Sequence, residues 1–150
     1  MKYTKTEKGI IIVLARGENV IETLTDFCTK ENITAGVFQG IGAVERVKIG
    51  YYDLGKKEYF FRDLSACNAQ ADEAGVFEVA SMQGNVALVD GKPFIHAHAV
   101  LSRCDATCEC IGAHIKEAFV AVTLEIYLTP LDISVSRKLN DDIGLKLLDI

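Results

Sequence analysis

The fold is decided by the stretch PFIHAHAVLSR at residues 93–103, which a cysteine-rich loop joins to GAH at residues 112–114. His96 and His98 are two positions apart, so in a strand both imidazoles project from one face, about 7 Å apart. His114 follows the loop, and a strand that pairs back would bring its imidazole to the other two. Three histidines on one face can bind zinc and leave a position open for water or a ligand. The stretch therefore predicts a zinc site, or a site for another divalent metal, at His96, His98 and His114.

The alternative interpretation of this stretch is that His96 and His98 are polar residues on the solvated face of a strand. The third histidine, just past a short loop, favours a ligand site over that alternative. Since only neutral imidazole binds zinc, a metal site here would weaken as the pH falls through the histidine range near ~6.5.

The size and composition indicate one soluble globular domain. The chain has 150 residues, of which 49% are hydrophobic and 25% are charged, enough for one sizeable core. No segment approaches the ~20 consecutive apolar residues of a membrane span, and the charged start lacks the apolar core of a secretion signal. We therefore expect a cytoplasmic protein. The net charge of −5 disfavours unaided DNA binding, because Lys and Arg contacts to phosphates supply most of such affinity.

The five cysteines of the chain are an odd number without a framework spacing, and in a reducing cytosol we expect free thiols. They are Cys28, Cys67, Cys104, Cys108 and Cys110. A competing zinc set combines Cys104, Cys108 and Cys110 with His114, since thiolates and imidazole are both good zinc ligands. Its spacing matches no common zinc motif, and thiols in a surface hairpin loop are the favoured interpretation.

Hydrophobic periodicity predicts an α+β domain of about seven or eight strands with one main helix at residues 19–30. The expected strands cover residues 9–14, 33–42, 44–53, 58–64, 76–89, 93–103 and 118–128, with a loop or one helical turn at 67–75. Residues 136–150 are expected to form a tail or an added strand. Three glycines within residues 33–42 suggest a phosphate loop, but the strand–loop–helix context is missing, so a bulged strand is favoured.

Glu125 stands inside an otherwise apolar strand, where a carboxylate needs a partner. It is a candidate to hold a metal-binding histidine in place, and an exposed structural acid is the alternative. A cysteine nucleophile is not supported by the spacing of the cysteines and histidines.

Several motifs in combination resemble the plants-and-prokaryotes-conserved (PPC) domain family, in its single-domain prokaryotic branch. They are LARGE at residues 14–18, GIGAV at 40–44, FEVASMQGN at 77–85, the spacing Pro93-x-x-His96-x-His98-x-x-Leu101, Gly112-x-His114 and Glu125. The resemblance spans residues 5–135, and Ala113 stands where the family usually has a second glycine.

The resemblance implies an α+β fold with a mostly antiparallel sheet, a homotrimer, and a metal site at His96, His98 and His114 near a subunit interface. Glu125 and Glu78 are neighbouring or interface candidates. In plant relatives the domain is joined to an AT-hook that enters the DNA minor groove, and it mediates self-association and contacts with transcription factors. This chain has no AT-hook, so DNA binding by the chain alone is not expected.

Three hypotheses about function follow from these features. The first is a homotrimeric PPC-domain protein with a three-histidine zinc site and a regulatory, DNA-associated or ligand-binding role. The second is a metal-dependent enzyme that acts on a small molecule through an open zinc position, with Glu125 assisting. The third is a transcription accessory module that contacts a protein regulator through residues 77–82.

Overall fold

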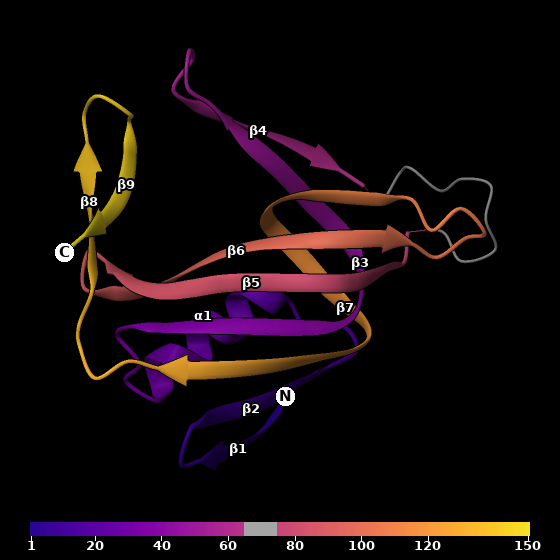
Figure 1. The fold of residues 1–150 in the computed structure, drawn as a ribbon, viewed down its shortest axis with the longest axis horizontal. Helices are drawn as coiled ribbons and strands as arrows, with labels where there is room; N and C mark the ends of the chain where they lie inside the picture. Colours follow the sequence, from indigo (N-terminus) through magenta and orange to yellow (C-terminus); the bar gives the residue numbers. More distant parts are fainter. Residues whose placement is uncertain (65–74) are drawn as a thin grey trace.

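A computed structural model describes residues 1–64 and 75–150 and contains nine strands and one helix in that part of the chain (Figure 1). The elements in order are β1 (Lys2–Thr6), β2 (Gly9–Ala15), α1 (Val20–Lys30), β3 (Gly36–Asp53), β4 (Glu58–Asp63), β5 (Phe77–Val89), β6 (Lys92–Arg103), β7 (Cys110–Pro130), β8 (Ser136–Asn140) and β9 (Leu145–Asp149). The loop predicted at residues 67–75, with Cys67, lies outside the described residues except for Gly75.

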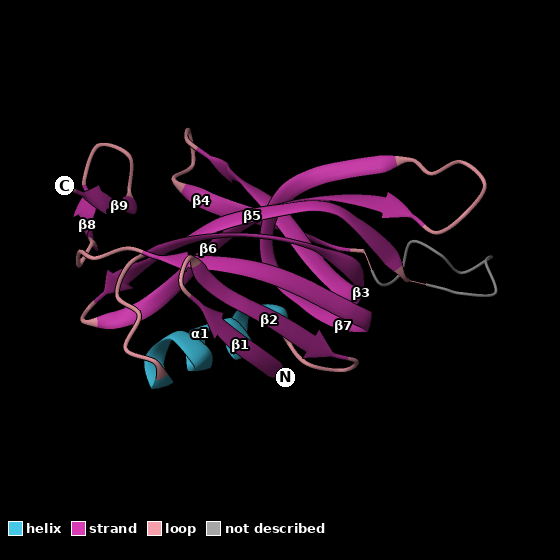
Figure 2. Cartoon of the chain, turned by 60° about the horizontal axis from the view of Figure 1, so that its bottom comes forward, coloured by secondary structure: helices cyan, strands magenta, loops and turns pink. Residues whose placement is uncertain are grey.

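Helix α1 begins at a side-chain cap and buries one face. The Asn19 side-chain oxygen accepts hydrogen bonds from the backbone N–H groups of Ile21 and Glu22, at 3.1 and 3.3 Å, which satisfies two donors that a helix N-terminus otherwise leaves open. Val20, Leu24, Phe27 and Cys28 form the buried face. This face packs against β6 and β7 on one side of the sheet (Figure 2). The helix predicted at residues 19–30 is confirmed.

The four long strands β3, β5, β6 and β7 form a closed ring of strand pairings. β3 pairs with β5 and with β7, and β6 also pairs with β5 and with β7, all antiparallel. The hairpin of β1 and β2 extends the sheet beyond β7, and β4 extends it beyond β3. The core lies inside this curved sheet and under α1. Ile12 and Leu14 of β2, opposite Ile126 and Leu124 of β7, are completely buried, at 0% exposure.

The α+β class with a mostly antiparallel sheet is confirmed, and the strand count is higher than predicted. Residues 33–42 and 44–53 were predicted as two strands but form the single strand β3, which is irregular between Gly40 and Gly42. The predicted bulge is therefore present. A Cβ at Gly42 would lie 2.1 Å from the carbonyl oxygen of Thr123, so the close approach of β7 requires glycine there. Strand β1 was missed because all five of its residues are exposed and show no apolar alternation.

The predicted buried strand at residues 9–14 is present, but only one face of it is buried. Ile11 and Val13 point outward and are 36% and 38% exposed. A continuous run of apolar residues therefore supplies both the core and an apolar outer surface.

The C-terminal residues form a hairpin, β8 and β9, where one tail or added strand was predicted. It joins the sheet by the parallel pairing of Ser136 with Leu88. Its turn meets the β3–β4 hairpin, where the Tyr52 hydroxyl donates to the Ile143 carbonyl at 2.6 Å and Lys57 Nζ donates to the Asp141 carbonyl at 2.9 Å. No helix in the described part of the chain is long and apolar enough to cross a membrane.

Candidate metal centre

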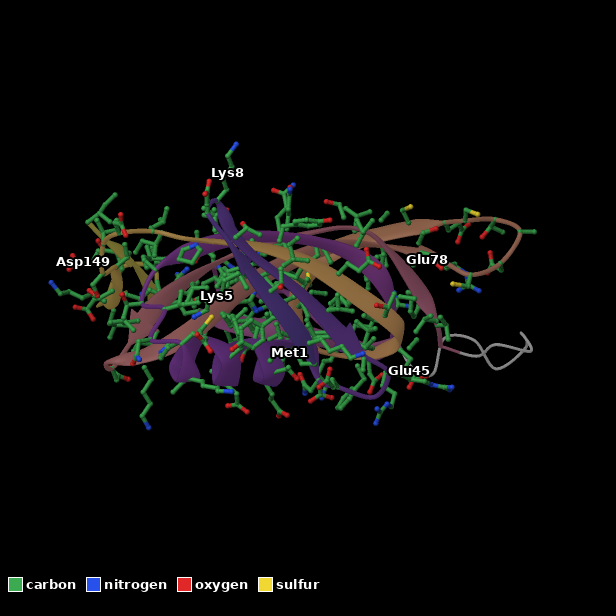
Figure 3. All side chains as sticks on the ribbon, turned by 90° about the horizontal axis from the view of Figure 1, so that it is seen from below. Met1, Lys5, Lys8, Glu45, Glu78 and Asp149 are labelled. Carbon is green, nitrogen blue, oxygen red and sulfur yellow. The ribbon has the colours of Figure 1, made fainter. Side chains whose placement is uncertain are left out.

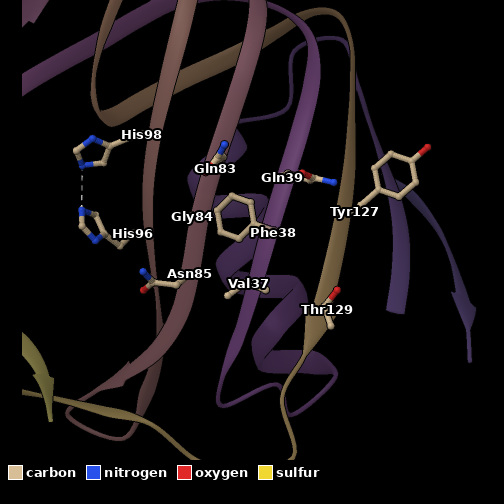
Figure 4. A pocket seen from close by; sticks show the side chains of 10 residues that line it. All are labelled: Val37, Phe38, Gln39, Gln83, Gly84, Asn85, His96, His98, Tyr127 and Thr129. Carbon is tan, nitrogen blue, oxygen red and sulfur yellow. Dashed lines mark hydrogen bonds between the residues drawn. The ribbon is translucent and has the colours of Figure 1, made fainter. Parts of the chain in front are cut away.

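The three histidines converge at one place on the outer face of the sheet. His96 and His98 lie on β6, and His98 is directly opposite His114 of β7. The Nε2 atoms of His96 and His98 are 3.2 Å apart (Figure 4). One nitrogen from each ring lies within 4.8 Å of the other two, and within residues 1–64 and 75–150 no other group of three or more His, Cys, Asp or Glu ligand atoms meets so closely.

The distances fit a tetrahedral metal after a small closing movement. Two nitrogens bound to zinc at about 2.0 Å in tetrahedral geometry are roughly 3.3 Å apart, which is close to the His96–His98 separation of 3.2 Å. The Nδ1 atom of His114 is buried and has no hydrogen-bond partner within the described residues. Such an orphaned polar atom is costly, and it leaves this ring in need of an interaction. The residues present therefore fit a divalent metal.

The local environment keeps two of the rings neutral. Burial, and then the neighbouring His96 and His98, lower the pKa of His114 to about 4. Burial, followed by the charge of Arg137 and by His98, also lowers the pKa of His96. Neutral imidazole is the form that binds metal, so these two rings are ready to act as ligands at neutral pH.

Arg137 is brought to the histidines by the C-terminal hairpin. Its Nη2 atom donates to Asn85 Oδ1 at 2.8 Å and lies 3.4 Å from Nδ1 of His96. Its Nε atom is buried without a hydrogen-bond partner in the described part of the chain, and its burial lowers the pKa of its guanidinium. A partly buried cation thus lies beside the proposed metal ligands.

Two aromatic side chains of β4 border the histidines on the other side. The ring of Tyr59 lies 4.9 Å from that of His114 and stacks on Phe61 at 5.3 Å with an interplanar angle of 11°. Register explains this arrangement, since Gly50 of β3 is paired with His114 on one side and with Phe61 on the other. Because Gly50 has no side chain between them, the imidazole lies next to the aromatic wall.

The histidine cluster lies between two cavities. One, of about 630 Å³, is on the face formed by β3, β5, β6 and β7, and its lining includes Gln39, Gln83, His98 and Tyr127 (Figure 4). The other, of about 720 Å³, is lined by all three histidines and by the aromatic wall of Tyr59 and Phe61. Neither cavity has an aspartate or glutamate among its described lining residues.

Glu125 and Glu78 are not brought to the histidines. Glu125 lies on β7 opposite Ile41 of β3, and on this side of the sheet β3 and β5 separate it from β6. Glu78 is five residues before Gln83, the β5 partner of His98, which corresponds to roughly 16 Å along a strand. Figure 3 shows Glu78 toward the opposite end of the molecule from Asp149 of the C-terminal hairpin.

The cysteines do not form the competing zinc set, because His114 faces the other histidines and the described thiols do not meet within ligand distance of one another. Cys108 is exposed in the loop between β6 and β7, and Cys110 is exposed at the start of β7. Cys28 is on the buried face of α1, and burial raises the pKa of its thiol to about 12, which makes it unreactive.

Comparisons with known proteins agree with this fold and cluster. The sequence matches the profile of the Plants and Prokaryotes Conserved (PCC) domain, also abbreviated PPC, over residues 1–132. The chain belongs to this family. No curated protein matches the sequence.

Solved PPC-like structures cover almost the whole chain. A PPC protein from Pyrococcus horikoshii is 31% identical with a TM-score of 0.81, and covers 99% of this chain and 95% of its own. A metal-containing protein from Archaeoglobus fulgidus is 30% identical with a TM-score of 0.81 over 100% of both chains. A candidate DNA-binding protein from Ralstonia eutropha JMP134 is 29% identical with a TM-score of 0.84, covering 99% and 96%.

Sequence reasoning missed Arg137, Asn85 and Tyr59 as neighbours of the PPC histidine cluster. Asn85 was quoted in the family motif at residues 77–85, and its strand register beside His96 could have identified it. Arg137 lies beyond the matched residues, and only the pairing of β8 with β5 brings it to the site. No local pattern in the sequence signals that contact.

Proposed function

We propose that this PPC-domain protein is a cytoplasmic homotrimer that binds one divalent metal ion per chain, zinc, through His96, His98 and His114, and that it has a ligand-binding or regulatory role. The observation that carries the proposal is the convergence of three imidazole nitrogens within 4.8 Å. The metal would supply a Lewis-acidic centre with an open coordination position. One solved relative is itself named as metal-containing.

Metal analysis of the purified protein tests this proposal. We expect about one zinc per chain in the wild type and a loss of most of it in His98→Ala. His98 is exposed, so its truncation should leave the fold intact. Gln83→Ala is the matched control, because Gln83 is the exposed β5 neighbour of His98 and offers no imidazole. Equal zinc in His98→Ala and the wild type, or no zinc in either, would contradict the proposal.

Self-association is supported by an apolar outer face that the chain leaves open. Ile41 of β3 and Val13 of β2 flank Glu125 of β7. Two residues further along β7, Tyr127 lies between Gln39 of β3 and Ile11 of β2. Ile41 is 57% exposed and Tyr127 is 52% exposed. Exposed apolar side chains grouped in this way around one acid are typical of an interface. Gln39 and Gln83 connect this surface to His98, which would place the metal close to the subunit boundary.

Direct DNA binding is not part of this proposal, although one relative is named a candidate DNA-binding protein. The net charge of −5 opposes contact with phosphates. Residues 77–82 offer a limited surface for a protein regulator, because Phe77, Val79 and Met82 are buried. Fluorescence anisotropy with duplex DNA at physiological salt should show no saturable binding, and micromolar or tighter binding would contradict this expectation.

A further inference from the structure

The charges around the histidine cluster identify the kind of ligand that the site requires. Three neutral imidazoles cannot balance a dication, and the guanidinium of Arg137 lies 3.4 Å from Nδ1 of His96. A bound metal would therefore place three positive charges in a partly buried region, where their mutual repulsion is only weakly screened.

No carboxylate of the described residues relieves this excess of positive charge. The chain has 21 aspartates and glutamates, yet neither cavity beside the histidines includes one in its described walls. Glu125 and Glu78, the two acids expected to lie near the site, are on other parts of the sheet. The described walls of both cavities therefore leave the charge of a bound metal unbalanced, and an anionic ligand would balance it.

The volume and lining of the larger cavity indicate the size and character of the rest of the ligand. Its volume of about 720 Å³ exceeds what a water molecule or a chloride ion needs. Tyr59 and Phe61 form one wall with nearly parallel rings, and Gly112 and Ala113 contribute small residues next to His114. Aromatic walls favour a flat or apolar body, while the metal and the nearby guanidinium of Arg137 favour an anionic head.

We propose that the metal-loaded protein binds a small carboxylate with an apolar or aromatic body, with the carboxylate held at the metal and the body lying against Tyr59 and Phe61, and that Arg137 makes the site selective for anions. This inference rests on the proposed metal site. Arg137 acts through its charge, since its Nη2 atom contacts the Nδ1 side of His96, whereas the Nε2 atom of His96 faces His98.

Arg137→Gln should have two opposite effects. In buffer without carboxylates, its zinc affinity should rise, because a repulsive charge has been removed. Its affinity for benzoate in the zinc-loaded state should fall by roughly fivefold or more, the effect of one charge at such a distance. If Arg137 had only a structural role, its substitution would weaken both zinc binding and benzoate binding. Arg16→Gln makes the same charge change in the turn between β2 and α1, whereas Arg137 lies beside His96, and it should alter neither affinity.

The experiment titrates zinc-loaded protein with benzoate, acetate and the neutral analogue benzyl alcohol by calorimetry, and measures zinc affinity by competition with a chelator. We expect benzoate to bind more tightly than acetate, benzyl alcohol to bind at least tenfold more weakly than benzoate, and Tyr59→Ala to remove the preference for benzoate over acetate while retaining zinc. Benzoate should also tighten zinc binding by the factor by which zinc tightens benzoate binding.

Two failures are distinguishable in this experiment. If the wild type holds no zinc, the proposed function fails and the inference fails with it. If zinc binds at one per chain but benzoate binds no more tightly than benzyl alcohol, or Arg137→Gln behaves like Arg16→Gln, the metal site stands and the inference about the ligand is overturned.

Discussion

Gly84 of β5 lies so close to Phe38 of β3 that a Cβ atom at residue 84 would be 2.2 Å from Cζ of Phe38. The same Cβ would be 2.4 Å from the backbone oxygen of His96. Glycine at this position therefore allows the phenyl ring to pack beneath the strand that carries the first two histidines. The FEVASMQGN motif therefore requires glycine at residue 84 because there is no room for a side chain.

Gly84→Ala should destabilise the protein and disturb the metal site together. The added methyl group must displace Phe38 or the β6 backbone, and overpacking of this kind costs about 1–3 kcal/mol. Urea unfolding measures the loss of stability, and zinc content reports the displacement of His96. Gly112→Ala is the matched control, because its Cβ would meet nothing closer than 3.6 Å. Equal stability of the two variants would contradict this explanation.

Asn19→Ala should destabilise the protein by about 1 kcal/mol, because the N-terminal N–H groups of α1 lose their side-chain acceptor. Asn19 is only 9% exposed, so water cannot easily replace its oxygen. Asn19→Asp keeps an oxygen acceptor at the cap and should retain most of the stability in urea unfolding. An aspartate variant as unstable as the alanine variant would show that the cap is not the source of the effect.

The metal-free protein should lose stability as the pH falls from about 6.5 toward about 4. The folded-state pKa of His114 is lowered from 6.5 to about 4, so within this window the unfolded chain binds a proton that the folded chain does not. The free energy of unfolding therefore decreases as the solution is acidified, and His96, whose pKa is lowered as well, contributes in the same direction.

Urea unfolding at a series of pH values checks this dependence. His114→Asn should flatten the curve between pH ~6.5 and ~4. His98→Asn should leave most of the dependence, since burial is the main cause of the His114 shift. A curve that is equally steep in the wild type and in His114→Asn would rule out this ring as the source.

The helix, the hairpin of β3 and β4, and the histidine strand could be predicted because each is a local pattern. The apolar spacing from Val20 to Cys28, the Asp90-Gly91 turn before β6 and the i, i+2 histidines all lie within a few residues of sequence. The meeting of His98 with His114 could also be anticipated, because a short loop joins their strands. The neighbours of this pair on the sheet depend on register between distant strands.

The remaining features depend on contacts that no local pattern records. Arg137 reaches His96 across 41 positions of sequence, and the β3–β4 hairpin meets the C-terminal hairpin across 91 positions, from Tyr52 to Ile143. Glu125 shows a related difficulty. The sequence left open whether this acid supports a histidine or is an exposed structural acid, because periodicity does not show that the strand has an outer face, and Glu125 is exposed there.

Tyr52→Phe should loosen the C-terminal hairpin without unfolding the sheet. Its hydroxyl donates to the Ile143 carbonyl at 2.6 Å, and a two-stranded hairpin is only marginally stable by itself. Loss of one hydrogen bond, worth about 1 kcal/mol, should raise the hydrogen-exchange rates of β8 and β9 amides roughly fivefold. Tyr51→Phe, at a side chain that is 63% exposed, is the control. Unchanged exchange in Tyr52→Phe would show that the hairpin is held by other contacts.

Ile41→Glu should convert the proposed trimer into monomers. Ile41 is 57% exposed and lies across β7 from Val13, which is 38% exposed, so a trimer that buries this face would have to desolvate the new carboxylate. Glu125 lies directly opposite residue 41 on β7, and two like charges in that position repel each other. A buried charge without an opposite partner costs several kcal/mol, which exceeds the margin of most interfaces of moderate size. Sedimentation velocity measures the change. Leu54→Glu introduces the same charge at a side chain of similar exposure, 58%, in the turn after β3, and should leave the assembly intact. If Ile41→Glu remains trimeric while Leu54→Glu dissociates, the interface lies at the β3–β4 turn and not on the face that leads to His98.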